Sequence, residues 1–183
     1  RQRKMCIRDS GISIKYIRRV MRGPNIRLIR VMPNTPALAG EGMSVISYED
    51  RRGSQGEILI EDIFRGMGRV IEMSENLLDS VTALSGSGPA YFFLMAEVME
   101  KFAVENGIKP EHAGDLTVQT LKGTAALMEK SCQKSFRQLR DDVTSPGGTT
   151  QAALEFLAEN GFTELFYKAL GRAKERAAEL ASD

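Results

Sequence analysis

The sequence has little of the chemistry that several large enzyme classes need. Its 183 residues include a single histidine, His112, and two cysteines, Cys6 and Cys132. With no second histidine or cysteine beside it, His112 provides no metal-ligand spacing, so we expect no metal site. A Ser-His-Asp triad would depend wholly on His112, and no G-x-x-x-x-G-K-[ST] motif occurs. Zinc chemistry, triad hydrolysis and phosphate-loop nucleotide hydrolysis are therefore disfavoured.

Long hydrophobic runs, a signal peptide and a charge excess are also lacking. No apolar run approaches the roughly 18 residues of a membrane helix, and the N-terminus has no apolar signal-peptide core. The 25 lysines and arginines nearly balance the 24 acids, which predicts neither nucleic acid nor membrane as a partner. Basic residues gather only in the first 30 positions, where we favour a solvated helix face. Two distant cysteines give no disulfide framework, so we expect a cytoplasmic protein.

The first part of the chain, residues 11–75, has the alternating pattern of βα units. The segments expected here are a helix at 12–20 stopped by Gly23-Pro24, strands at 26–32, 43–48 and 69–73, and a helix at 57–64 closed by Gly66 or Gly68. We interpret this region as the C-terminal part of a Rossmann-like α/β domain.

After residue 75 strands disappear and helices remain, so the fold class is an α/β remnant followed by an all-α bundle. The helices expected are 76–84, one opened by Pro89 and ended by Gly107, one opened by Pro110, a short one capped by Ser135, one at 150–159, and a last one capped by Thr163. The helix after Pro89 is apolar on almost every side, more than so small a bundle can cover. A homodimer built across these helices would cover it.

The segment SGSGPAY begins at Ser85 and contains G-x-G before a helix, as dinucleotide-binding loops do. Tyr91 stands at the third glycine position, no strand precedes the segment, and Pro89 removes a backbone donor. We therefore interpret it as a tight helix-to-helix junction.

The segment DDVTSPGGTT ends at Thr150, where a helix is expected to begin. The N–H groups of Gly148, Thr149 and Thr150 would converge there with the positive end of the helix, which favours a small anion such as a carboxylate. The alternative is a plain N-cap in which Thr149 or Thr150 is the capping residue. The residues alone leave both open.

The pentapeptide MPNTP, starting at Met32, follows a predicted strand. Asn34 and Thr35 would stand at the carboxyl end of that strand, where open α/β sheets bind ligands. An ordinary turn is the alternative.

Read in order, RVMPNTPALAGEGMSVI, LSGSGPAYFFLMAEVME and LRDDVTSPGGTTQAALEFLAENGF closely resemble the pyrroline-5-carboxylate reductase family. The resemblance runs from about Gly11 to the C-terminus. It implies the last step of L-proline biosynthesis, in which NADPH or NADH gives a hydride to the imine carbon of 1-pyrroline-5-carboxylate and the ring nitrogen is protonated. Family members are dimers through their helical domains, often assembled into larger rings.

The resemblance also implies roles for individual residues. Thr150 matches the threonine whose hydroxyl lies by the ring nitrogen, as hydrogen-bond partner and possible proton donor, although relay from water is equally plausible. The residues expected to bind substrate are Ser145, Gly147, Gly148, Thr149, Thr150 and Glu75. Those expected near the cofactor are Met32, Pro33, Asn34 and Asp142, the last standing where many relatives have asparagine.

The chain departs from the family at its start. The family's G-x-G-x-x-G loop is not found before Gly11, where the charged stretch RQRKMCIRDS stands instead. This stretch resembles translated sequencing-adapter DNA, so we expect residues 1–10 to be non-native and the chain alone to be inactive. A continuous native reading frame through these ten codons in the genomic DNA would contradict this expectation.

Three interpretations thus follow from the sequence. The first is the reductase, with residues 11–75 belonging to the cofactor domain and 76–183 forming the substrate-binding and dimerisation domain. The second is a non-catalytic helical module for dimerisation or for binding a small carboxylate. The third is a related NADP-dependent reductase of another imine or of a 3-hydroxy acid.

Overall fold

The computed structural model describes residues 12–21, 27–50 and 53–182. The expected non-native segment 1–10, the helix stop at Gly23-Pro24 and the first residue of the strand expected at 26–32 lie outside these ranges. The chain divides into two compact units, one formed by residues 1–90 together with 168–183 and the other by Tyr91–Tyr167. The predicted domain boundary after residue 75 stays a prediction.

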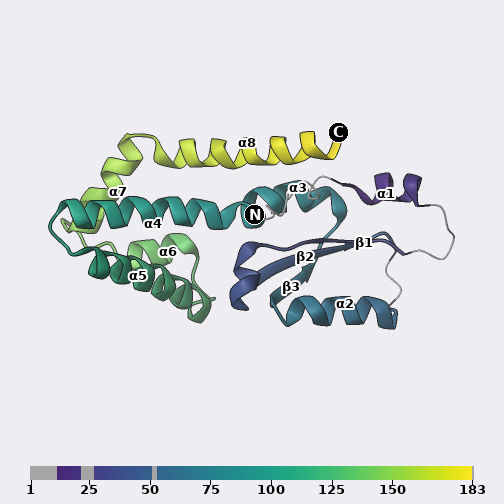
Figure 1. Ribbon diagram of the computed structural model, residues 1–183. Helices are drawn as coiled ribbons and strands as arrows, with labels where there is room; N and C mark the ends of the chain where they lie inside the picture. The colour runs from purple at the N-terminus through teal and green to yellow at the C-terminus, as the bar shows by residue number, and fades with distance from the viewer. Residues whose placement is uncertain (1–11, 22–26, 51–52, 183) are drawn as a thin grey trace, which may run out of the picture. The chain divides into compact units, whose positions relative to one another are not determined.

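The first unit contains a three-stranded sheet in the order β1-β2-β3 (Figure 1). β1 (Ile29–Met32) pairs antiparallel with β2 (Gly42–Tyr48), and β2 pairs parallel with β3 (Gly68–Glu72). A parallel pair needs a crossover, which α2 (Gln55–Arg65) provides, so the βα pattern predicted from the sequence is confirmed. α1 (Ile14–Val20) precedes the sheet and is capped by Ser13, whose side chain accepts from the Tyr16 N–H.

The core of this unit lies between the central strand and the short helix α3 (Leu78–Val81). Val45 is 2% exposed, Leu78 is completely buried and Val81 is 8% exposed, while Met32 and Met73 pack against them. Figure 1 shows α2 and α3 on opposite sides of the sheet. β2 is therefore covered on both faces, which holds the ends of β1 and β3 in place.

The helix predicted at 76–84 is built from three kinds of turn. A 3-10 turn at Glu75–Leu77 leads into α3, and a π-helical turn follows at Thr82–Gly86. After Ser87, α4 (Gly88–Glu105) begins. The interpretation of SGSGPAY as a junction between helices is confirmed.

The remaining helices are α5 (Pro110–Lys130), α6 (Phe136–Asp142), α7 (Thr149–Glu159) and α8 (Phe162–Ser182). Gly107 and Gly161 adopt positive φ angles of 88° and 70° where α4 and α7 end, which a side chain would resist. Ser135 caps α6 in a complete capping box with Gln138, as predicted. The prediction that Thr163 caps the last helix is wrong, because α8 begins at Phe162 and Thr163 lies inside it. None of the helices in the described ranges is long and apolar enough to cross a membrane.

The cap of α2 should contribute measurably to stability. The Ser54 side chain accepts from the Glu57 N–H at 3.4 Å, and the buried Glu57 carboxylate accepts from the Ser54 N–H at 3.0 Å. We expect Ser54→Ala to cost about 1 kcal/mol of stability and to lower the melting temperature by a few degrees. Thr163→Ala is the control: it lies in the first turn of α8 without capping it and should leave the melting temperature almost unchanged. Equal losses in both variants, measured by circular dichroism, would contradict this assignment of the caps.

Candidate active site

The loop before α7 turns sharply at two glycines. Gly147 has a φ of 71°, a conformation that favours glycine. Gly148 is the extended N-cap residue, and its N–H donates to the Ser145 carbonyl at 3.0 Å. A Cβ at Gly148 would lie 3.0 Å from the same carbonyl oxygen, which is tighter than an ordinary contact. Both glycines are therefore needed for this shape of the loop.

The start of α7 is not capped by a side chain. The alternative that Thr149 or Thr150 is the capping residue is wrong, because the N-cap is Gly148 and both threonines lie inside the helix. The Ala152 N–H donates to the Gly148 carbonyl, and the Gly147 N–H donates to the Gln151 side chain at 2.7 Å. Among the described residues, the N–H groups of Thr149 and Thr150 have no such acceptor. Two N–H donors at the positive end of an 11-residue helix suit a carboxylate.

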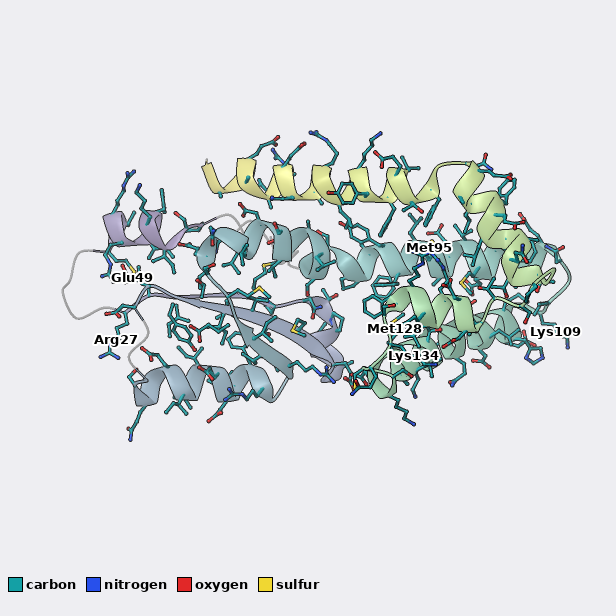
Figure 2. All side chains as sticks on the ribbon, turned by 180° about the vertical axis from the view of Figure 1, so that it is seen from behind. Arg27, Glu49, Met95, Lys109, Met128 and Lys134 are labelled. Carbon is teal, nitrogen blue, oxygen red and sulfur yellow. The ribbon has the colours of Figure 1, made fainter. Side chains whose placement is uncertain are left out.

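The two aspartates before this loop are both paired with cations. Asp142 accepts from Lys134 Nζ at 2.7 Å, and Lys134 lies just before α6 (Figure 2). Asp141 lies 3.1 Å from the Arg140 guanidinium and 3.9 Å from that of Arg137. These side chains are half exposed or more, so each pair adds little to stability. Their effect is to offset negative charge beside a site suited to an anion.

The residues expected near the cofactor lie in the first unit. Met32 is the last residue of β1, and Pro33 and Asn34 lead into a 3-10 turn at Thr35–Ala39. Asn34 has an extended backbone and does not cap this turn with its side chain. Instead its Oδ1 accepts from the Met43 N–H at 2.9 Å, and its Nδ2 donates to Ser85. The loop is therefore attached to β2 and to the π-helical turn.

Glu75 has two partners within the same unit. Its Oε1 accepts from the Ile14 N–H at 2.7 Å and from Arg30 Nη1 at 3.1 Å. The carboxylate thus joins the start of α1 to β1. A role for Glu75 in binding substrate stays a prediction.

The described residues of each unit line a hollow. One, of about 560 Å³, lies in the first unit around Lys15, Arg18, Glu49 and Glu75. Arg18 donates to Glu49, which Figure 2 labels, and this hydrogen bond holds the pKa of the Glu49 carboxyl below its usual value. The arginine pKa is raised by the same bond.

The other hollow, of about 610 Å³, lies in the second unit between α4, α5 and α7. Its lining is almost wholly apolar and includes Met99, Phe102, Leu116 and Phe156. Its polar side chains are the hydroxyls of Thr117 and Thr120, and no charged residue lines it. Within the described ranges, no group of three or more His, Cys, Asp or Glu side chains is placed to hold a metal ion.

Several partners of the predicted residues were not expected from the sequence, and three of them are examples. Ser85 holds Asn34, Lys134 pairs with Asp142, and Gln151 binds the Gly147 N–H. Only Gln151 had a signal, since a Gln four residues after a glycine in a tight loop can fold back onto its N–H. The other two contacts depend on tertiary structure.

Comparisons with known proteins agree with the resemblance. Residues 75–180 match the model of the pyrroline-5-carboxylate reductase dimerisation family. A pyrroline-5-carboxylate reductase of Synechocystis sp. is 40% identical over 171 residues, which are 93% of this chain and 63% of the relative. One of Arabidopsis thaliana is 40% identical over 155 residues, 85% of this chain and 56% of the relative. This chain thus spans less than two thirds of the length of these relatives.

Solved structures give the same result. The structure of Plasmodium falciparum pyrroline carboxylate reductase with NADP bound superposes with a TM-score of 0.85 and 34% identity, covering 93% of this chain and 68% of that one. That of a pyrroline-5-carboxylate reductase from Coxiella burnetii gives 0.84 and 39%, covering 93% and 63%. The fold class predicted from the sequence is confirmed. Because the family model matches more than half of the residues of this chain, the chain belongs to the pyrroline-5-carboxylate reductase family.

Proposed function

We propose that the protein to which this chain belongs reduces 1-pyrroline-5-carboxylate to L-proline, with NADPH or NADH as hydride donor. Membership of the family supports the reaction. The observation that carries the proposal in this structure is the start of α7, where a glycine N-cap leaves the Thr149 and Thr150 N–H groups without an acceptor among the described residues. A substrate carboxylate would complete this helix end.

The threonines next to these N–H groups have the chemistry that the second half of the reaction needs. When bound, the nicotinamide dinucleotide supplies the hydride that forms the new C–H bond at the imine carbon. The ring nitrogen then needs one proton. The Thr150 hydroxyl, which is not used as a helix cap, would donate a hydrogen bond to that nitrogen and pass on a proton taken from water, because a threonine hydroxyl alone is too weak an acid.

Ser145, Gly147 and Gly148 would shape the carboxylate pocket, and Glu75 would act near the substrate. Met32, Pro33, Asn34 and Asp142 would approach the cofactor. Met32, Pro33 and Asn34 lie at the carboxyl end of β1, and open α/β sheets bind ligands at this edge. Asp142 is paired with Lys134, so it would meet the cofactor as part of a neutralised pair.

The proposed domains are a cofactor domain that includes residues 11–75 and a substrate-binding and dimerisation domain at 76–183. The match of the family model over residues 75–180 supports the second. We also propose that two copies associate through the second unit, because α4 exposes Phe92, Phe93 and Phe102 at 63–70% and borders the apolar hollow. Assembly beyond a dimer is a further possibility that the family resemblance implies.

The reaction is tested by following NADPH oxidation with 1-pyrroline-5-carboxylate. We expect no activity from this chain alone. We expect clear activity once the N-terminal segment of the Synechocystis relative is joined to it, because the family resemblance implies a dinucleotide loop in that segment. If neither protein oxidises NADPH although circular dichroism shows that both are folded, the result would favour a non-catalytic module or a different imine substrate.

The role of Thr150 is tested in the same extended protein. Valine keeps the branched shape and the helix propensity of threonine but lacks the hydroxyl. We expect Thr150→Val to lower kcat/KM by about tenfold to a hundredfold, since it removes a group that acts in the transition state, and to leave the melting temperature nearly unchanged. Thr163→Val is the matched control, because Thr163 is the second residue of α8 as Thr150 is of α7. Parallel losses of activity and stability in Thr150→Val would instead indicate a structural role.

Association is tested by sedimentation of this chain as it stands. A charge introduced into the apolar hollow must be desolvated when the surface is buried. We expect Phe102→Asp to weaken dimerisation by at least tenfold, while Leu59→Asp should have no effect. Leu59 is similarly exposed, at 61% against 67%, but lies on α2 in the first unit. A monomeric wild-type chain, or equal weakening in both variants, would overturn the proposed surface.

A further inference from the structure

The π-helical turn at Thr82–Gly86 contains a carbonyl group whose helical donor is missing. The Ser87 N–H donates to the Thr82 carbonyl at 2.8 Å, five residues back, which is the π-helical spacing. In an α-helix the Ser85 carbonyl would accept from residue 89. That residue is Pro89, which has no N–H. The next N–H, that of Ala90, donates to the Ser87 carbonyl at 3.0 Å.

The side chain of Asn34 supplies the missing donor. Its Nδ2 lies 3.4 Å from the Ser85 carbonyl oxygen and 3.2 Å from Ser85 Oγ. Its Oδ1 accepts from the Met43 N–H at 2.9 Å. The Asn34 amide, the Ser85 carbonyl and the Met43 N–H are partly buried, so leaving any of them unpaired would cost folding free energy. One amide therefore links the loop after β1 both to the central strand and to the turn, which lies 51 residues away in sequence.

Gly86, the residue after Ser85, lies close to Met32, which stands two residues before Asn34. A Cβ built on Gly86 would lie 2.4 Å from Cε of Met32. Any side chain at Gly86 would therefore displace the end of the Met32 side chain. The turn contacts this segment at two points, Met32 and Asn34, on either side of the exposed Pro33.

We propose that the π-helical turn at Thr82–Gly86 is the positioning element for residues 32–34, and that Ser85 is a positioning residue which acts through Asn34. The inference rests on the proposed function only for the identity of the ligand, because it is the proposed function that places the nicotinamide cofactor next to residues 32–34. In this proposal the SGSG motif supports residues 32–34. Ser85 holds the loop that would face the cofactor, and Gly86 leaves space for the Met32 side chain. Pro89 has no N–H, so the Ser85 carbonyl is available to Asn34.

The contact is tested first by amide hydrogen exchange of this chain, which requires neither cofactor nor activity. Ser85→Ala removes one of the hydrogen bonds that orient the Asn34 side chain. A bond of this kind is worth about a factor of five in the local opening equilibrium, so the Met43 amide should exchange about fivefold faster. Ser87→Ala is the matched control, because it removes a hydroxyl from the same motif that makes no contact with the loop in the described structure. Unchanged exchange in Ser85→Ala, or an equal change in Ser87→Ala, would overturn the proposal.

A double-mutant cycle and kinetics then separate positioning from general stability. In Asn34→Ala the Ser85→Ala change should add nothing to Met43 exchange, whereas additive effects would overturn the coupling. In the extended protein, Ser85→Ala and Gly86→Ala should raise KM for NADPH about three- to tenfold and leave KM for 1-pyrroline-5-carboxylate within about twofold. Faster exchange with an unchanged KM for NADPH would overturn the positioning role. If the wild-type extended protein is inactive, the proposed function fails, and hydrogen exchange alone decides whether the turn holds the loop.

Discussion

The first unit depends on the packing of β2 against α3. Val45 and Leu78 are almost or completely buried, and β2 hydrogen-bonds to a strand on each side. This contact places the end of β1 next to the turn that follows α3. The loop at residues 32–34 and Ser85 meet because of it, since neither segment has any local reason to find the other. The core therefore determines the geometry of the loop, and Met32 at the start of the loop packs directly against it.

The secondary structure was largely predictable because its signals are local. Proline at the start of α5, glycine after α4 and α7, and the Ser135–Gln138 capping box all act within one helical turn. The alternation of strand and helix predicted the α/β part, and the parallel pairing of β2 with β3 followed from it. The two glycines at 147 and 148 likewise indicated the sharp turn before α7.

The parts that could not be predicted depend on contacts between distant residues or on small energy differences. The bond from Asn34 to Ser85 spans 51 residues, and the pair of Lys134 and Asp142 does not have helical spacing. A π-helical turn differs from an α-helical one by a single shifted hydrogen bond, for which the motif SGSG has no separate signature. Thr163 failed as a predicted cap because the helix begins at Phe162, two residues before the Glu164 that the prediction implied. Helix boundaries vary easily by one or two residues.

The helices differ in how the N–H groups of their first turns are satisfied. α1, α2 and α6 each begin with a serine whose side chain accepts a backbone N–H, and α5 begins with a proline that has none to satisfy. α7 has two threonines available, yet its N-cap is a glycine without a side chain. Side chains do not cap every helix, since α3 continues a 3-10 turn and α5 has no side-chain cap. At α7, however, two threonines are at hand and neither caps the helix, and local departures of this kind are expected at functional sites. The same reasoning applies to the turn before α4, where Pro89 removes a helical donor and Asn34 replaces it. In both places a backbone group has no partner within its own helix. The Ser85 carbonyl is paired with a neighbouring loop, and the N–H groups at the start of α7 are the ones that we propose bind a carboxylate.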